Sequence, residues 1–270
     1  MNPFFVQWNN SLWLFDMRHT AHAKLFEGLQ QPWDGLVALN GYILSLLEIE
    51  SRSGSGGSPV TGTSAPAPEA KLQDSRLAAA RVRAIPGVRL SGDVWVGENT
   101  QIEPGAMIQG PVHIGRGCRV ETGVFIRGPA WIGDNCEIRQ AAYLRGFVLA
   151  GDNAVLGHAC EFKHCLLLEY AQAPHFNYVG DSILGVRAHI GAGVILSNVR
   201  LDKKNIRARS LESPRESIDT GLEKFGAILG DECEIGCNSV LNPGTILGAR
   251  CRALPLSRVK GSWPEESLIE

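Results

Sequence analysis

The stretch LSGDVWVGENTQIEPGAMIQGPVHIGRGCRVETGVFIRGPAWIGDNCEIRQAAYLRGFVLAGDNAVLGHACEFKHCLLL, residues 90–168, has an apolar residue at every sixth position. These positions are Leu90, Val96, Ile102, Ile108, Ile114, Val120, Ile126, Ile132, Ile138, Leu144, Ala150, Leu156, Phe162 and Leu168. The residue four places further on is usually small, as at Ala106 and Cys118. A helix has a period of 3.6 residues and a strand a period of two, so neither explains this spacing. A strict six-residue period is typical of a parallel β-helix built from hexapeptide repeats.

The period also predicts how each coil is built. Three hexapeptides make one triangular coil of about 18 residues, with one short strand on each side. The aliphatic side chain points into the prism, and the small residue fits near a corner. Intervals such as Gly-Asp-Asn, residues 151–153, supply turns that tolerate positive φ. Each coil covers only its neighbours, so both ends of the β-helix need caps. We therefore expect a mainly β protein.

The remaining segments differ in composition. We expect residues 1–50, which contain aromatic residues such as Trp33, to form a small helical segment that packs on the β-helix or on a neighbouring subunit. Residues 51–68 have the composition of a flexible linker, and residues 69–87 that of a capping helix. The β-helix domain spans residues 88–261, with a polar insertion at 199–223 that we interpret as an exposed arm. Residues 262–270 are predicted to be a frayed acidic tail. The repeat changes phase after Leu168, across residues 174–178.

Composition excludes several classes of function. The chain is 44% hydrophobic and 20% charged, with a formal net charge of −2, which gives no electrostatic case for binding nucleic acid or an anionic membrane. No apolar run reaches the length of a transmembrane helix, and the N-terminus has no signal-peptide pattern, so we expect a cytoplasmic protein. Five cysteines fall on the small interior position, and we expect buried thiols there rather than zinc or disulfides: Cys118, Cys136, Cys160, Cys233 and Cys251.

A few polar residues stand out from the repeat. Glu161 and Lys163 flank the inward Phe162, so both point outward. Arg145 lies 18 residues, or one coil, before Lys163, and His175 lies two sides of the prism after it. This spacing can bring two cations and a histidine to one groove between subunits. Cations suit a phosphate-bearing substrate, and a histidine suits general-base work. The other candidates are Tyr178, Asn198 and Lys224.

Three segments carry a family resemblance. They are EFK at 161–163, PHFNYVGDS at 174–182 and IGAGVILSN at 190–198. They resemble the acetyltransferase half of the bifunctional N-acetylglucosamine-1-phosphate uridyltransferase / glucosamine-1-phosphate acetyltransferase family. The run DTGLEKFGAILGD at 219–231 is similar to the archaeal-type sugar-1-phosphate nucleotidylyltransferase/acetyltransferases. The resemblance covers residues 88 to 250.

This resemblance implies a left-handed parallel β-helix and a homotrimer with active sites between subunits. It also implies transfer of an acetyl group from acetyl-CoA to the amine of an amino-sugar phosphate, such as glucosamine 1-phosphate, or of a nucleotide sugar. His175 would be the general base, with Glu161 as the acid beside Lys163. Lys163, Arg145 and Lys224 would hold the sugar phosphate, and Tyr178 and Asn198 would orient the sugar. Ala192 would bind acetyl-CoA through its backbone, with His189 and Cys237 on the same side.

The sequence departs from the family pattern at several points. Residues 1–85 contain no nucleotide-binding loop and are too short for the uridyltransferase half. His189 stands where the family has asparagine, Cys237 stands where it has a small polar residue, and the last coil lacks its glycines. A second hypothesis is therefore a trimeric scaffold or regulatory protein without catalysis. A third is a zinc enzyme of the γ-carbonic-anhydrase type that uses His158, His164 and His175, although the family resemblance itself implies no metal.

Overall fold

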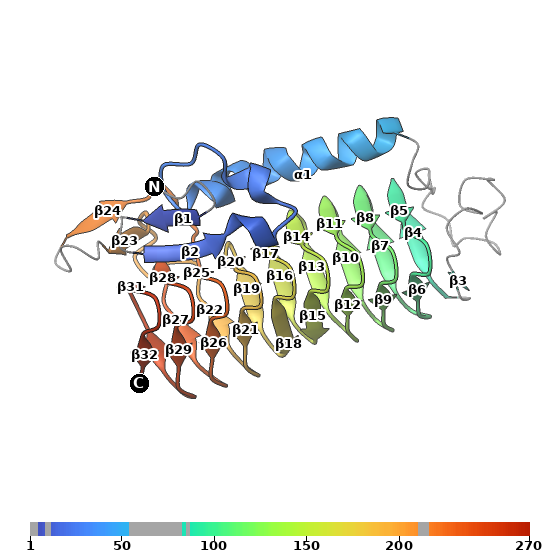
Figure 1. Cartoon of the computed structure of the whole chain (residues 1–270). Helices are drawn as coiled ribbons and strands as arrows, with labels where there is room; N and C mark the ends of the chain where they lie inside the picture. Colours follow the sequence, from blue (N-terminus) through green and yellow to red (C-terminus); the bar gives the residue numbers. More distant parts are fainter. Residues whose placement is uncertain (1–4, 9–11, 54–82, 85–86, 210–215) are drawn as a thin grey trace.

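The computed structural model of the protein describes residues 5–8, 12–53, 83–84, 87–209 and 216–270. Three parallel sheets run along one axis and form a three-sided β-helix (Figure 1). Sheet 1 contains β4 (Arg89–Ser91), β7 (Met107–Gln109), β10 (Phe125–Arg127), β13 (Tyr143–Arg145), β16 (Glu161–Lys163), β19 (Tyr178–Gly180), β22 (Ile195–Leu196), β27 (Val240–Leu241) and β30 (Arg258–Val259). Sheet 2 contains β5 (Val94–Val96), β8 (Val112–Ile114), β11 (Ala130–Ile132), β14 (Val148–Ala150), β17 (Cys165–Leu167), β20 (Ile183–Leu184), β25 (Ala227–Leu229), β28 (Thr245–Leu247) and β31 (Ser262–Trp263). Sheet 3 contains β3 (Arg83–Ala84), β6 (Gln101–Ile102), β9 (Arg119–Val120), β12 (Glu137–Ile138), β15 (Val155–His158), β18 (Gln172–His175), β21 (His189–Ile190), β26 (Glu234–Ile235), β29 (Arg252–Ala253) and β32 (Leu268–Ile269).

Strands of successive coils pair in register, which stacks the aliphatic positions of the repeat. Ile126 pairs with Leu144 in sheet 1, and Ile132 pairs with Ala150 in sheet 2. Both pairs are completely buried in the interior of the prism. The predicted parallel β-helix and its aliphatic core are therefore confirmed. The five cysteines on the small interior position are buried too, as predicted.

The phase shift falls earlier than the sequence suggests. Phe162 still pairs one coil of 18 residues back, with Leu144, but Cys165 pairs with Val148, only 17 residues back. The lost residue lies at the corner between sheets 1 and 2, where His164 alone joins β16 to β17. As a result Leu167 takes the interior position. Leu168 points outward and packs with the N-terminal segment.

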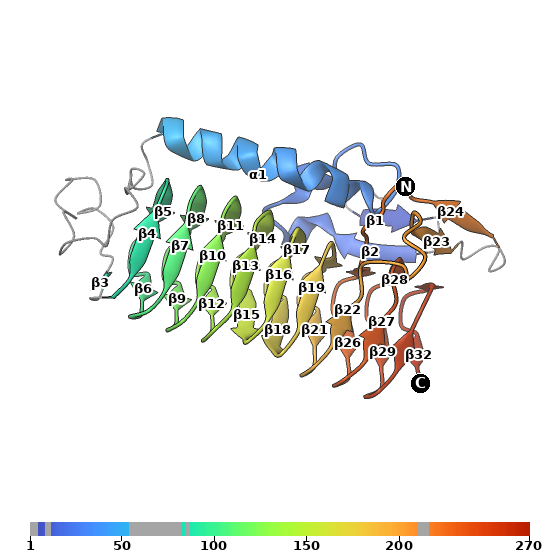
Figure 2. The ribbon, with the colours of Figure 1, turned by 180° about the vertical axis from the view of Figure 1, so that it is seen from behind.

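The N-terminal segment packs on the β-helix, as one of the two predicted arrangements requires. Helix α1 (Asp34–Ser53) lies along sheet 2 (Figure 2) and buries Trp33 and Ile43 in a second apolar cluster with Ile183 of that sheet. The prediction of a purely helical segment is wrong, since β1 (Phe5–Trp8) and β2 (Leu12–Asp16) form an antiparallel hairpin. Two short 3-10 helices follow, η1 (Met17–His19) and η2 (Ala23–Phe26).

The predicted linker and capping helix can be compared with the structure only in part. Most of both segments, residues 54–82 and 85–86, lies outside the described residues. Residues 51–53 belong to α1 rather than to a linker. Residues 83–84 form strand β3, which pairs with β6, so a helix through these positions is wrong. The β-helix thus begins before residue 88.

The insertion, in part, and the tail also differ from prediction. The insertion contains the hairpin β23 (Arg207–Arg209) and β24 (Ser217–Asp219). Most of its described residues are exposed, but Ile206 and Ala208 are buried on the chain's own core. The tail forms the final coil instead of fraying. Leu247 pairs with Trp263, and Ala253 with Ile269, which is 3% exposed. The tail does not fray because the apolar side chains of Trp263 and Ile269 pack on the end of the prism.

Candidate functional site

The predicted site residues lie along the two edges of sheet 1, in the middle coils of the β-helix. The edge shared with sheet 2, called corner 1–2 here, follows residues 145, 163 and 180, at the ends of sheet 1 strands, and residue 198, two places after β22. The edge shared with sheet 3, called corner 3–1, follows residues 158, 175, 192 and 237. The structure therefore sorts the candidates into two groups separated by the length of one strand.

At corner 1–2 three candidates gather with a residue that the sequence analysis did not single out, Asp181. Lys163 Nζ donates to both carboxylate oxygens of Asp181, at 2.8 and 2.9 Å. Asn198 Nδ2 donates to Asp181 Oδ2 at 2.5 Å and lies 3.1 Å from Tyr178 Oη. His164 Nδ1 lies 2.9 Å from Asp181 Oδ1. We call these five residues the Asp181 cluster.

The short corners of these coils explain why the cluster forms. Lys163 pairs with Gly180 across β16 and β19, so His164 and Asp181 follow at equivalent positions. Each continues the chain directly from sheet 1 toward sheet 2, and each has a positive φ of 47°. In a corner with one more residue, that residue would lie between the end of the strand and the residue equivalent to His164 or Asp181. The loss of one residue per coil therefore places histidine and aspartate side by side.

The charge of Asp181 is set by its surroundings. Asp181 is 3% exposed, and burial alone would raise the pKa of its carboxyl group. Hydrogen bonds from His164, Lys163 and Asn198 outweigh burial, so the pKa of Asp181 is lowered below its ordinary value. The group is an anion at neutral pH, and the ammonium of Lys163 compensates its charge.

Tyr178 reaches the cluster because residue 180 is glycine. A Cβ atom on Gly180 would lie 2.5 Å from Tyr178 Oη and 2.7 Å from Cζ, so the tyrosine ring lies directly over the glycine. Burial, followed by the nearby charges of Asp181 and Glu161, raises the pKa of Tyr178. The phenol is therefore neutral at physiological pH and serves as a hydrogen-bonding group.

The predicted phosphate-binding cations are not free. Arg145 Nη1 donates to Glu161 Oε1 at 2.5 Å, and Lys163 is engaged with Asp181. Both members of the Arg145–Glu161 pair are partly exposed, 46% and 35% for the side chains. A phosphate would have to replace a carboxylate as the partner of one of these cations. The sequence placed Arg145 and Lys163 one coil apart, but it did not predict their acidic partners.

Lys224 lies near the same corner. It is exposed and directly precedes Phe225, whose amide donates to the backbone carbonyl of Asn198 at 3.0 Å. The next residue, Gly226, donates to the backbone carbonyl of Asp181 at 2.8 Å. The insertion therefore returns the chain to the Asp181 cluster and leaves the Lys224 side chain in solvent beside it.

The other predicted residues lie at corner 3–1 or next to it. His175 is exposed, and its imidazole makes no hydrogen bond to any residue that the structure describes. Its backbone carbonyl accepts from Gly193, beside Ala192, whose own carbonyl accepts from Asn238 at 2.8 Å. Cys237 is exposed at the same corner, and His189 on β21 pairs with Glu234 at 2.9 Å. The predicted base thus lies near the residues that were predicted to bind acetyl-CoA, apart from the Asp181 cluster.

The structure does not assemble the proposed zinc ligands within one chain. His158 and His175 are in register at corner 3–1, whereas His164 is at corner 1–2. Among the described residues no three His, Cys, Asp or Glu side chains are placed to hold a metal ion. Within the same residues, no helix has the length and apolar character needed to cross a membrane.

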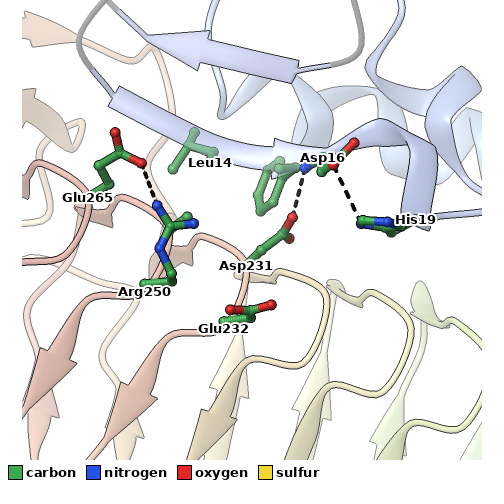
Figure 3. Close-up of a pocket in the computed structure, with 9 residues that line it drawn as sticks. Leu14, Asp16, His19, Asp231, Glu232, Arg250 and Glu265 are labelled. Atoms are coloured by element: carbon green, nitrogen blue, oxygen red, sulfur yellow. Dashed lines mark hydrogen bonds and ion pairs between the residues drawn. The ribbon is translucent and has the colours of Figure 1, made fainter.

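A cavity of about 410 Å³ lies elsewhere, between β2, η1 and the last coils (Figure 3). Its lining includes Asp16, His19, Asp231, Arg250 and Glu265. Asp231 binds the N-terminal segment, because its carboxylate accepts from the Asp16 amide at 2.7 Å. Burial raises the pKa of Asp231 to about 7. None of the residues predicted for the site lines this cavity.

With this geometry in hand, the comparisons with known proteins identify the repeat. Residues 93–128 match the model "Bacterial transferase hexapeptide (six repeats)", and residues 126–250 match the GMPPB C-terminal domain. The β-helix is a hexapeptide-repeat domain. The Asp181 cluster and both edges of sheet 1 that carry the predicted residues fall within the second match.

Curated relatives connect this domain with acetyltransferases. The bifunctional sugar-1-phosphate nucleotidylyltransferase/acetyltransferase of Sulfurisphaera tokodaii is 33% identical over 100 residues, 37% of this chain and 24% of that protein. The bifunctional protein GlmU of Methanocaldococcus jannaschii is 33% identical over 100 residues, 36% of this chain and 22% of that protein. The chain thus matches about a quarter of the length of these relatives. A solved structure of the polysialic acid O-acetyltransferase OatWY aligns over 66% of this chain and 77% of that chain, with 14% identity and a TM-score of 0.24, and carries no argument here.

Proposed function

We propose that the protein transfers an acyl group from acyl-CoA to the amine of an amino-sugar phosphate or a nucleotide sugar. One observation supports this most strongly: Lys163, Tyr178 and Asn198 converge on the buried Asp181 in the part of the chain that matches the GMPPB C-terminal domain. The cluster offers hydrogen-bond donors and a neutral phenol to the hydroxyl groups of a sugar. Arg145, Lys163 and Lys224 are the cations that would accept its phosphate.

In this proposal the general base comes from another copy of the chain. Successive residues of a strand are about 3.3 Å apart, so the two ends of a three-residue strand lie at different corners of the prism. Corners 3–1 and 1–2 of one chain therefore face different directions. A homotrimer would place corner 3–1 of one subunit against corner 1–2 of the next. His175 would then face the acceptor amine, with Glu161 beside Lys163. His189, Ala192 and Cys237 would line the groove that holds acetyl-CoA as cosubstrate.

The first experiment is a titration of acetyl-CoA into the protein, with and without glucosamine 1-phosphate. We expect saturable binding at about one site per chain in a trimer, followed by formation of the N-acetyl product. Failure to bind acetyl-CoA under both conditions would contradict the proposal and support a scaffold or regulatory role. The altered last coil, in which Leu256 is 77% exposed, is the region where such a loss would originate.

A second experiment tests the arrangement between copies. His175→Ala and Asn198→Ala are each expected to lower the rate of transfer, the first by about 10²–10⁴-fold as for loss of a general base. Co-expressed variants form mixed trimers in which about a quarter of the interfaces contain both intact residues. We therefore expect co-expression to restore about a quarter of the wild-type rate. If the mixture stays as inactive as either variant, the two residues act within one chain.

A further inference from the structure

His164 and Asp181 form a pair that the family resemblance does not assign. Nδ1 of His164 lies 2.9 Å from the buried carboxylate, and the His164 side chain keeps 21% of its surface exposed. Its Nε2 has no hydrogen-bond partner among the described residues. An ionised carboxylate only accepts hydrogen bonds, so Nδ1 is the nitrogen that donates to it and Nε2 is the nitrogen left to accept a proton. A buried aspartate orients a histidine in this way when the histidine is to remove a proton.

The pair is also held rigidly. Lys163 and Asn198 bind the same carboxylate, so Asp181 cannot rotate away from the imidazole without losing both partners. The ring of Phe147 packs against His164 edge-on, with centroids 6.5 Å apart. The main-chain amide of His164 donates to the Gly146 carbonyl at 3.0 Å, which fixes the corner itself. A histidine that only filled a turn would not need these constraints.

The chemistry of an amine acceptor requires two proton acceptors. At neutral pH the amine enters as an ammonium ion, which must lose one proton before its lone pair can attack. It loses a second proton after the N–C bond to the acyl group has formed. The C–S bond then breaks, and the thiolate of CoA takes one of the two protons. The balance is RNH₃⁺ plus acyl-S-CoA giving RNH-acyl, HS-CoA and one H⁺, which leaves to solvent.

We propose that His164, oriented by Asp181, is a second catalytic base and takes the first proton from the acceptor ammonium. His175 takes the second proton and passes it to the departing thiolate. This inference rests on the proposed function, because it assumes an amine acceptor at the Asp181 cluster. It places the base for the ammonium in the same chain as Lys163 and Asn198.

The decisive variant is His164→Asn. The asparagine amide can still donate to Asp181, but it has no group that accepts a proton, so it separates the packing role from the base role. We expect kcat at saturating acetyl-CoA to fall by about 10²–10⁴-fold, with unchanged Tm and unchanged affinity for acetyl-CoA. His19→Asn is the matched control. His19 also lies beside an aspartate, since its Nδ1 is 3.5 Å from Asp16 Oδ2. It belongs to η1, far in sequence from the Asp181 cluster, so His19→Asn should leave kcat unchanged.

A measurement that does not depend on turnover accompanies the kinetics. Imidazole ¹⁵N NMR of the wild-type protein should show His164 as the Nδ1–H tautomer, identified by the loss of its signals in His164→Asn. The opposite tautomer would overturn the inference. So would a His164→Asn enzyme that keeps its kcat within about threefold of wild type. A wild-type protein that transfers no acyl group would overturn the proposed function, whereas activity that is insensitive to His164 would overturn only the second base.

Discussion

The carboxyl group of Asp231 makes the docking of the N-terminal segment depend on pH, and Asp231→Asn should remove that dependence. Asp231 accepts hydrogen bonds from the main-chain amides of Asp16 and Val186, at 2.7 and 2.8 Å. Its own amide donates to the Leu14 carbonyl at 2.8 Å. The residue therefore connects strand β2 to the coils of sheets 2 and 3. Burial opposes its ionisation more strongly than the two amides favour it.

The sign and the size of this effect on the unfolding free energy follow from the raised pKa of Asp231. Burial raises the pKa of Asp231 from 3.8 to about 7, so between these values the folded protein binds a proton that the unfolded chain has lost. This contribution to stability is complete below pH 3.8 and is lost as the pH rises through 7. This rise in the pKa from 3.8 to about 7 corresponds to about 4 kcal/mol. Asparagine carries no charge, but its Nδ2 cannot accept the hydrogen bond that one carboxyl oxygen accepts, and this loss costs about 1–3 kcal/mol. The variant should therefore match wild type within about 1 kcal/mol at pH 5 and exceed it by about 1–3 kcal/mol at pH 8.

Urea unfolding of both proteins at pH 5, 6, 7 and 8 measures this difference directly. Other titrating groups contribute equally to both proteins, so the difference in unfolding free energy isolates Asp231. The control is Glu232→Gln, which removes a charge from the same cavity at an exposed position. The charge of Glu232 also raises the pKa of Asp231, but less than burial does, so we expect this variant to keep most of the pH dependence of wild type. If Asp231→Asn shows the same slope of stability against pH as wild type, the assignment of the raised pKa to this carboxyl group is wrong.

Two further substitutions test the site and the packing. Gly180→Ala puts a Cβ 2.5 Å from Tyr178 Oη, so the ring must move and its hydrogen bond is lost. We expect KM for the acceptor to rise about fivefold, the equivalent of about 1 kcal/mol, in steady-state kinetics, with little change in Tm. Trp33→Ala removes a side chain that is 3% exposed and packs near Phe225, with ring centroids 6.3 Å apart. Calorimetry should show a loss of about 3–5 kcal/mol, and hydrogen exchange should show faster opening of α1 than of the β-helix.

The interior of this protein follows from its sequence because a prism admits only one kind of residue at each interior position. The pairing of Ile126 with Leu144 is predictable from the spacing of the repeat, since the period is a direct consequence of the coil length. The length of a corner is not fixed by the repeat in this way. A corner accommodates one residue or two, and nothing in a single residue such as His164 indicates which. That difference of one residue decides whether Leu167 or Leu168 faces the core.

The same limit applies to the candidate site. Lys163, Tyr178 and Asn198 could be chosen from motifs and from spacing, but Asp181 could not be distinguished from a turn aspartate that follows a glycine. Its importance arises from burial and from three side chains that reach it, two from the preceding coil and one from the following coil. The end of the β-helix was missed for a related reason. Trp263 lies four residues after Val259, outside the six-residue spacing, although its strand pairs with β28 like any other.

The position of the N-terminal segment bears on where a second copy could bind. Helix α1 and the hairpin occupy sheet 2 and the adjoining coils, and within the described residues they leave sheets 1 and 3 uncovered (Figure 2). Exposed apolar side chains follow corner 3–1 between them: Phe176 is 58% exposed, Leu254 46% and Leu256 77%. His175 lies directly beside Phe176 on this corner. A surface that is apolar along the line of the predicted base is suited to face another subunit, because burial of that surface and completion of the site would then occur together. In the proposed trimer this exposed edge would face the Asp181 cluster of the next subunit.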